Sequence, residues 1–154
     1  MNTKELAKSA KEASLALLGA DSELKNTALE AIRKNIEEKK EEICEANKQD
    51  LQEAKSLVDS GEIRSSTYAS LKLDENKMRD MLKGIQDVIS LEDPANKVLW
   101  TKELDEGLIL KKITCPIGVI GVIFEARPDV ISQIASLAIK SGNAVILKGG
   151  KESN

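Results

Sequence analysis

The stretch "IGVIGVIFEARPDVISQIASLAIKSGNAVILKGG", residues 117–150, places two branched apolar runs on either side of a segment with a helical pattern. The first run, 117–124, does not alternate with polar residues, which is typical of a parallel strand buried on both faces. Residues 128–142 open with a proline and close with a glycine, as many helices do. The second apolar run, 143–150, completes the order strand, helix, strand and predicts a βαβ unit.

Charged residues and glycines follow both predicted strands. In an open parallel sheet, ligands bind beyond the carboxyl ends of the strands. A helix N-terminus there attracts anions, and arginine matches a phosphate or carboxylate. The pattern therefore indicates one cleft for an anionic ligand; the alternative is that an Arg–Glu pair and solvated lysines merely occupy a domain edge. The residues concerned are Glu125 and Arg127 after the first strand, and Lys148, Gly149, Gly150 and Lys151 after the second.

The glycines of this region do not match a known nucleotide-binding loop. Gly118 and Gly121 fall within the first predicted strand, and neither G-x-G-x-x-G nor G-x-x-x-x-G-K-[ST] occurs in the chain. We interpret the two glycines as positions that permit close packing or the approach of a ligand. Six helical positions, Ile131, Ile134, Ala135, Leu137, Ala138 and Ile139, predict the apolar face of the helix that follows.

The upstream residues have a helical rhythm. We expect a helix over 3–18, then an amphipathic helix from Asp21 to about Ser56 that is continuous or broken once. Residues 65–73 are ambiguous. Asp74 predicts the start of a further helix that ends before Asp93-Pro94. Two strands, 97–104 and 108–115, then predict a hairpin with Gly107 in its turn.

Composition excludes several classes of function. The chain has 154 residues, 41% hydrophobic and 32% charged, which suits one domain with a solvated surface. It contains no histidine, which excludes Ser-His or Cys-His catalysis and histidine-ligated metals within this chain. A net charge of −3 and 2% aromatic residues argue against nucleic-acid binding. No apolar stretch suits a membrane span or signal peptide, so we expect a cytoplasmic protein.

The two cysteines, Cys44 and Cys115, lie far apart and have no metal-ligand spacing. We expect both to be reduced structural thiols. A single βαβ unit would leave an unpaired apolar edge, because parallel sheets need more strands and cover on both faces. We therefore expect these residues to be the front part of a larger protein.

The motifs "PIGVIGVIFEARPDV" and "SLAIKSGNAVILKGGKES" resemble the gamma-glutamyl phosphate reductases, a family of the aldehyde dehydrogenase superfamily. The strong resemblance covers 115–153, and the pattern of 1–114 also suits the N-terminal portion of that family. It implies an aldehyde dehydrogenase-like fold. It also implies reduction of gamma-glutamyl phosphate to glutamate 5-semialdehyde with NADPH, in proline biosynthesis. The family's catalytic cysteine would lie downstream, so this chain alone would be inactive.

The resemblance also implies roles for individual residues. Lys148 falls at a lysine that binds the adenosine ribose, next to Gly149 and Gly150. Lys151 replaces a frequent glutamate of NAD-preferring relatives, which favours the 2′-phosphate of NADPH. Arg127 falls at an asparagine that stabilises the oxyanion, which suits a substrate that carries phosphate. Glu125 would orient Arg127 or bind the substrate's amino group.

The implied organisation has three parts. Residues 1–96 would be the helical part of the cofactor-binding domain, 97–114 a hairpin, and 115–154 the first βαβ unit of an incomplete parallel Rossmann-type sheet. The hairpin, over 98–114, would be an arm through which copies of the chain form a homo-oligomer. Two alternatives remain: a CoA-acylating aldehyde dehydrogenase, and a non-catalytic helical interaction module.

Overall fold

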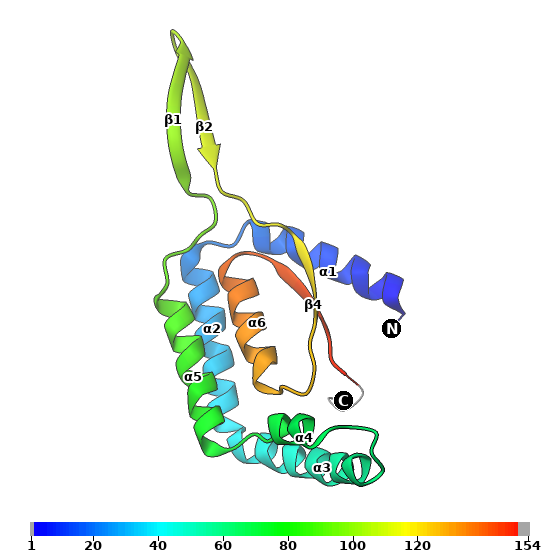
Figure 1. Cartoon of the computed structure of the whole chain (residues 1–154). Helices are drawn as coiled ribbons and strands as arrows, with labels where there is room; N and C mark the ends of the chain where they lie inside the picture. Colours follow the sequence, from blue (N-terminus) through cyan, green and yellow to red (C-terminus); the bar gives the residue numbers. More distant parts are fainter. Residues whose placement is uncertain (1, 151–154) are drawn as a thin grey trace.

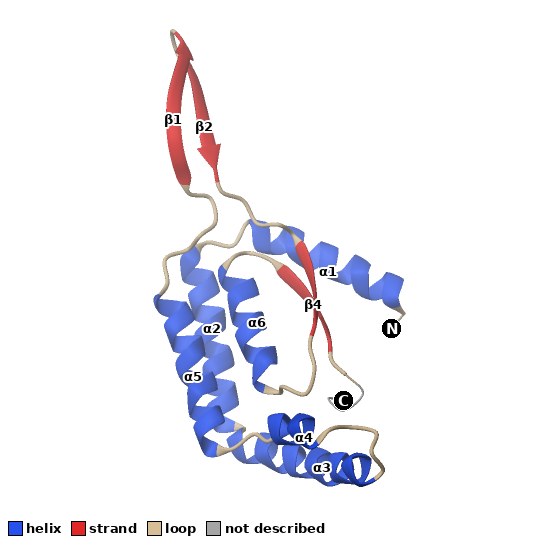
Figure 2. Ribbon diagram, in the orientation of Figure 1, coloured by secondary structure: helices blue, strands red, loops and turns tan. Residues whose placement is uncertain are grey.

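The computed structural model describes residues 2–150, in which helices partly enclose a short parallel sheet and a hairpin projects from one end (Figure 1). The predicted α/β class, with helices first, then a hairpin and then a βαβ unit, is confirmed (Figure 2). In chain order the elements are α1 (Thr3–Leu18), α2 (Ser22–Glu38), α3 (Lys40–Asp59), α4 (Ser65–Leu71), α5 (Glu75–Ser90), β1 (Val98–Asp105), β2 (Leu108–Ile113), β3 (Val119–Ile123), α6 (Asp129–Lys140) and β4 (Ala144–Lys148).

Short polar side chains begin three of the helices. Asn2, Asp21 and Asp74 precede α1, α2 and α5, and each accepts a hydrogen bond from the backbone N–H three residues later, at 2.9, 2.8 and 3.0 Å. These bonds satisfy N–H groups that the first helical turn leaves without partners. Within residues 2–150, every helix is too short or too polar to serve as a membrane span.

The long amphipathic segment is broken once, at Lys39, whose φ of −98° and ψ of 15° end α2 and begin α3. The break lets the two helices pack against different partners, α2 against α5 and α3 against α4 (Figure 1). The ambiguous residues 65–73 form the short helix α4 and an extended exit. Leu71 and Leu73 are buried there, at 3% and 7% exposure.

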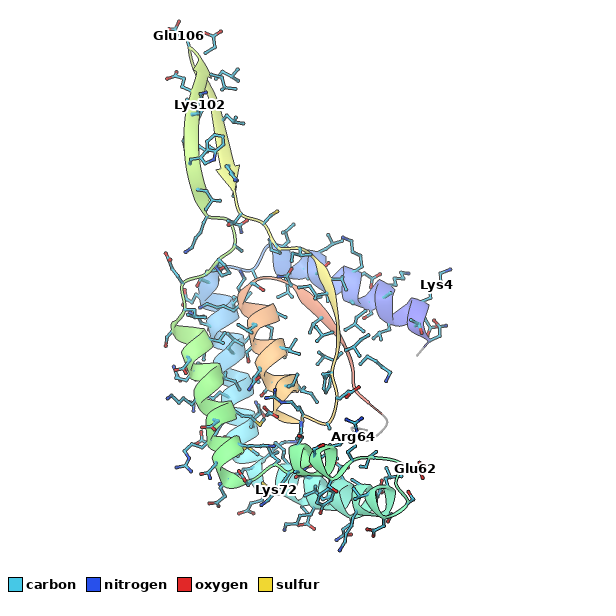
Figure 3. The ribbon with its side chains drawn as sticks, viewed as in Figure 1. Lys4, Glu62, Arg64, Lys72, Lys102 and Glu106 are labelled. Atoms are coloured by element: carbon cyan, nitrogen blue, oxygen red, sulfur yellow. The ribbon has the colours of Figure 1, made fainter. Side chains whose placement is uncertain are left out.

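The predicted hairpin is confirmed: β1 and β2 pair antiparallel, and Gly107 lies in the turn at φ 75°. Every residue of both strands is exposed. Figure 3 shows Lys102 on the hairpin and Glu106 at its far end, away from the helices. The hairpin therefore presents both faces outward, apolar side chains included.

The βαβ unit is also confirmed. β3 and β4 are adjacent and parallel, in register from Val119 opposite Ala144 to Ile123 opposite Lys148. Asn143 fixes the start of both strands, because its Oδ1 accepts the N–H of Gly118 at 2.9 Å. Helices α1 and α6 both contact β4.

Three small clusters form the core, and two of them tie the helices to the βαβ unit. Methionines fill the centre of one of them, as gap-filling side chains commonly do. The buried members are Leu29, Ile85 and Val88, against which Ile139 of α6 packs; Ala54, Leu71 and Ala126; and Leu73, Met78 and Met81.

The predicted burial of the first strand is wrong for this chain. Residues of β3 are half-buried or exposed, and Ile123 is 84% exposed. The sheet has only two strands within residues 2–150, so much of its surface stays uncovered. Gly118 lies before the strand at φ 112°, and an added Cβ at Gly118 or Gly121 would meet nothing within 4 Å. Close packing therefore does not explain either glycine here.

The predicted apolar face of α6 is also wrong in part. Ile131 and Leu137 are exposed, at 47% and 53%, whereas Ser132 and Ser136 are buried, at 7% and 1%. The serine hydroxyls donate to backbone carbonyls within the helix, which satisfies them without a partner outside it. Small side chains let α6 approach α5 and α2 closely. Residues at this contact must therefore be small, and a small polar side chain is accepted there.

A buried polar junction joins the helical layer to the βαβ unit. Lys25 of α2 is 2% exposed, and its Nζ pairs with Asp93 Oδ2 at 2.9 Å. Lys140, at the end of α6, is 3% exposed and donates to Asn26 Oδ1 at 2.8 Å and to the Ile89 carbonyl at 2.9 Å. Each ammonium is thus hydrogen-bonded, as buried charges require.

Candidate functional site

The carboxyl ends of β3 and β4 lie side by side. Ile123 is opposite Lys148, and the N–H of Phe124 donates to the Lys148 carbonyl at 3.1 Å. The segments that begin at Glu125 and at Gly149 therefore leave the same edge of the sheet, as the sequence predicts. Lys151 lies outside the described residues.

The loop between β3 and α6 is anchored by Ala126. This residue is 3% exposed and packs with Ala54 of α3 and Leu71 of α4. Its φ of 44° is unusual for a residue other than glycine, and such a conformation persists only where the surroundings hold it. The loop is thus fixed against the α3–α4 pair (Figure 1).

Arg127 pairs with Asp129, not with Glu125. The Arg127 Nη2 donates to Asp129 Oδ2 at 2.9 Å. The Arg127 side chain is 56% exposed and that of Asp129 is 11% exposed, so an exposed cation is held by a nearly buried anion. Glu125 is exposed and makes no side-chain hydrogen bond or ion pair with residues 2–150. The alternative of an Arg127–Glu125 pair at a domain edge does not occur.

Asp129 is a site residue that the sequence analysis missed. It is in the first turn of α6, where the helix dipole favours a negative charge. An acid two residues after an arginine, separated by the proline that begins a helix, was the available signal.

At the other strand end, Lys148 is exposed and its Nζ donates to the carbonyl of Gly149. Gly149 and Gly150 are half-buried. Arg127 and Lys148 thus place two exposed cations at one edge of the sheet, near the N-terminus of α6. This arrangement can bind an anion.

Both cysteines lie away from this edge. Cys115 is exposed and precedes β3, whereas Arg127 follows it, so the two occupy opposite ends of the strand. Cys44 is half-buried in α3 and packs against the cluster of Leu73, Met78 and Met81. Within residues 2–150 no group of three His, Cys, Asp or Glu side chains is placed to hold a metal ion.

No family model matches the chain. Against curated proteins, it is 59% identical over 152 residues to the gamma-glutamyl phosphate reductase of Brachyspira hyodysenteriae, which covers 99% of this chain and 35% of the relative. Nearly the whole chain is therefore similar to one part of a gamma-glutamyl phosphate reductase. The Acaryochloris marina reductase is 48% identical over 149 residues, again 97% of this chain and 34% of the relative.

Solved structures of the family agree with the fold. The gamma-glutamyl phosphate reductase of Saccharomyces cerevisiae has a TM-score of 0.92 and 44% identity, over 99% of this chain and 38% of its own. That of Thermotoga maritima has a TM-score of 0.89 and 34% identity, over 97% and 35%. The chain therefore spans about a third of the length of the gamma-glutamyl phosphate reductases it matches.

Proposed function

We propose that these residues are the N-terminal section of an enzyme that reduces gamma-glutamyl phosphate to glutamate 5-semialdehyde and releases phosphate, in the cytoplasmic synthesis of proline. The observation that carries the proposal is 59% identity, over 99% of the chain, to a protein of that name. The pair of cations at the ends of β3 and β4 gives the proposal a physical basis, because both the substrate and the product phosphate are anions.

The reaction needs a nucleophile and a hydride. A cysteine thiolate would displace phosphate from the acyl group, and hydride would then reduce the resulting thioester. NADPH supplies that hydride. Cys44 and Cys115 both lie away from the sheet edge where we place the substrate, so neither can attack it there. We therefore assign the nucleophile to a cysteine outside these 154 residues. The residues of this chain would bind and orient the substrate and the cofactor.

Arg127 is the proposed phosphate ligand. Its guanidinium has five N–H donors, of which Asp129 takes one, so several donors are left for an anion. Glu125 is exposed next to it and unpaired within residues 2–150, which suits recognition of the substrate's ammonium group. On the β4 side we assign the cofactor to Lys148, Gly149, Gly150 and Lys151, with Lys151 at the 2′-phosphate of NADPH.

The test uses the full-length protein in the reverse direction, with glutamate semialdehyde, phosphate and NADP. We expect Arg127→Ala to raise the KM for phosphate at least about tenfold, since a charged hydrogen bond is lost. Lys151→Glu should shift the preference from NADP toward NAD by a similar factor. Lys55→Glu, an exposed change on α3, is the charge-matched control for Lys151→Glu. A wild-type protein that is inert with phosphate but active with coenzyme A would contradict the proposal.

For the domain boundaries, we keep 1–96 as the helical part of the cofactor domain, 97–114 as an oligomerisation arm and 115–154 as the first βαβ unit. The arm exposes apolar side chains, among them Trp100 at 45% and Leu110 at 45%, and no other strand of residues 2–150 pairs with its two outer edges. A two-stranded hairpin of this kind is marginally stable without a partner.

The double variant Trp100→Lys with Leu110→Lys tests the arm. We expect it to lower the mass of the full-length protein measured by light scattering. An unchanged mass would argue against the arm.

A further inference from the structure

The ion pair between Arg127 and Asp129 has unequal partners. Arg127 is more than half exposed at the end of β3, whereas Asp129 is buried in the first turn of α6. Because α6 is fixed by its contacts with α5 and α2, the carboxylate is held on a rigid element. The arginine side chain has four rotatable bonds and gains a fixed position only from what it contacts.

Asp129 has no other strong partner within residues 2–150. Its Oδ1 is buried without a hydrogen bond, and its Oδ2 accepts from Arg127 at 2.9 Å and from Gln133 Nε2 at a long 3.4 Å. A buried carboxylate with one oxygen unsatisfied is unfavourable for stability. The dipole of α6 favours the negative charge of Asp129 but gives Oδ1 no hydrogen bond, so holding Arg127 is a reason for Asp129 beyond stability.

The backbone on the other side of Arg127 is fixed as well. Ala126 holds φ 44° and is buried against α3 and α4. Arg127 therefore extends from a loop whose backbone is fixed by Ala126 at one end and by the start of α6 at the other. The remaining freedom of Arg127 is in its side chain, and Asp129 restricts it there.

We propose that Asp129 is the positioning residue for Arg127: it holds one guanidinium arm and leaves the other donors oriented for the phosphate of the substrate. This inference rests on the proposed function, which gives Arg127 the phosphate. Asp129 acts only through Arg127, so its loss should weaken phosphate binding because the guanidinium must be ordered on each binding event. In this proposal, the cost of ordering the Arg127 guanidinium is larger than the gain in attraction between Arg127 and phosphate when the negative charge of Asp129 is removed.

A double-mutant cycle on the full-length protein tests this mechanism. We expect Asp129→Ala to lower kcat/KM for phosphate by about tenfold, the scale of one charged hydrogen bond. Asp129→Asn keeps the shape and an acceptor oxygen, so it should recover a part of that loss. In an Arg127→Ala background, Asp129→Ala should change kcat/KM less than twofold. Effects that multiply in the double variant would overturn the proposal.

A second measurement needs no turnover. Phenylglyoxal modifies free guanidinium groups, and its attachment at each arginine can be followed by mass spectrometry of the full-length protein. Asp129→Asn and Asp129→Ala should raise the modification rate of Arg127 several-fold, while Arg33, which pairs with Glu30 and Glu37, keeps its rate. Asp21→Asn, which changes another aspartate at a helix start, is the control.

The two experiments separate the failures. Equal rates at Arg127 in all forms, including no reaction, would contradict the positioning role whatever the substrate. A faster reaction at Arg127 in an enzyme that does not use phosphate would keep the pairing but overturn the proposed function, and with it the assignment of phosphate to Arg127.

Discussion

Gly142 shows how one residue fixes the path from α6 into β4. Its φ is 74°, a conformation that glycine adopts readily and other residues rarely. A Cβ added there would lie 2.9 Å from Pro116 Cγ and 3.6 Å from Lys25 Nζ. The rigid proline ring cannot move aside, so both backbone conformation and space require glycine.

We expect Gly142→Ala to lower the free energy of unfolding by about 2–3 kcal/mol, the sum of left-handed strain and overpacking. Gly84→Ala is the matched control. Gly84 lies inside α5 with nothing within 4 Å of an added Cβ, so alanine should stabilise the helix by about 0.5–1 kcal/mol. Urea unfolding of the 154-residue chain, followed by circular dichroism, measures both. Equal effects of the two changes would refute the steric argument.

At the scale of the element, α6 buries two serines that hydrophobic periodicity would expose, and exposes two of the six predicted apolar residues. Ser132 and Ser136 face the helical layer, and Ile131 and Leu137 are exposed. The helix itself was predictable from its start, its end and its spacing. Which side it buries depends on the distance to α5 and α2, and no feature of its own sequence records that distance.

The neighbours Ser136 and Leu137 give a direct test. Ser136→Leu should destabilise the chain by about 2 kcal/mol, because a large side chain enters a close helix contact. Leu137→Ser removes an exposed side chain and should change the stability of the 154-residue chain by less than about 0.5 kcal/mol. The same urea titration compares them. A larger loss of stability for Leu137→Ser than for Ser136→Leu would mean that α6 buries the side that carries Leu137 in solution.

At the scale of the molecule, the polar junction of Lys25, Asp93 and Lys140 docks the βαβ unit on the helices. Burial alone raises the pKa of Asp93, but hydrogen bonds from Lys25 and from the Ala95 backbone, with the charges of Lys25 and Lys140, bring the pKa below its ordinary value. A carboxyl whose pKa falls on folding stabilises the fold above its unfolded pKa of about 3.9, and this stability is lost as the pH falls through the lowered pKa.

We therefore expect the free energy of unfolding to fall as the pH drops below about 5 and through the lowered pKa of Asp93. Lys25→Met should lower it by about 2–3 kcal/mol at pH 7, because Asp93 loses its partner while it stays mostly buried. The variant should lose less stability on acidification than the wild type. Lys48→Met, which breaks the exposed pair with Glu45, should cost less than about 0.5 kcal/mol. If Lys25→Met and Lys48→Met lost equal stability on acidification, the junction would be excluded as the source of the pH dependence.

By itself, the sequence determined the local elements and the order of the fold. Polar caps at Asp21 and Asp74, the change to branched apolar runs after Pro94, and the glycine after α6 are local signals. The strand–helix–strand pattern predicted the strand ends, and the charged residues there predicted the candidate site at Arg127 and Lys148. These signals act within a few residues, where backbone conformation and hydrogen bonding are decided by neighbours in the chain.

Only the tertiary structure decided which side chains pair and which elements pack together. It paired Arg127 with Asp129 instead of Glu125, because Glu125 lies on the exposed side of the loop and Asp129 on the fixed start of α6. It also broke the long helix at Lys39 between two different packing partners and left β3 largely uncovered. Side-chain pairing and burial depend on distances between segments that are remote in sequence, and residue types alone do not specify those distances.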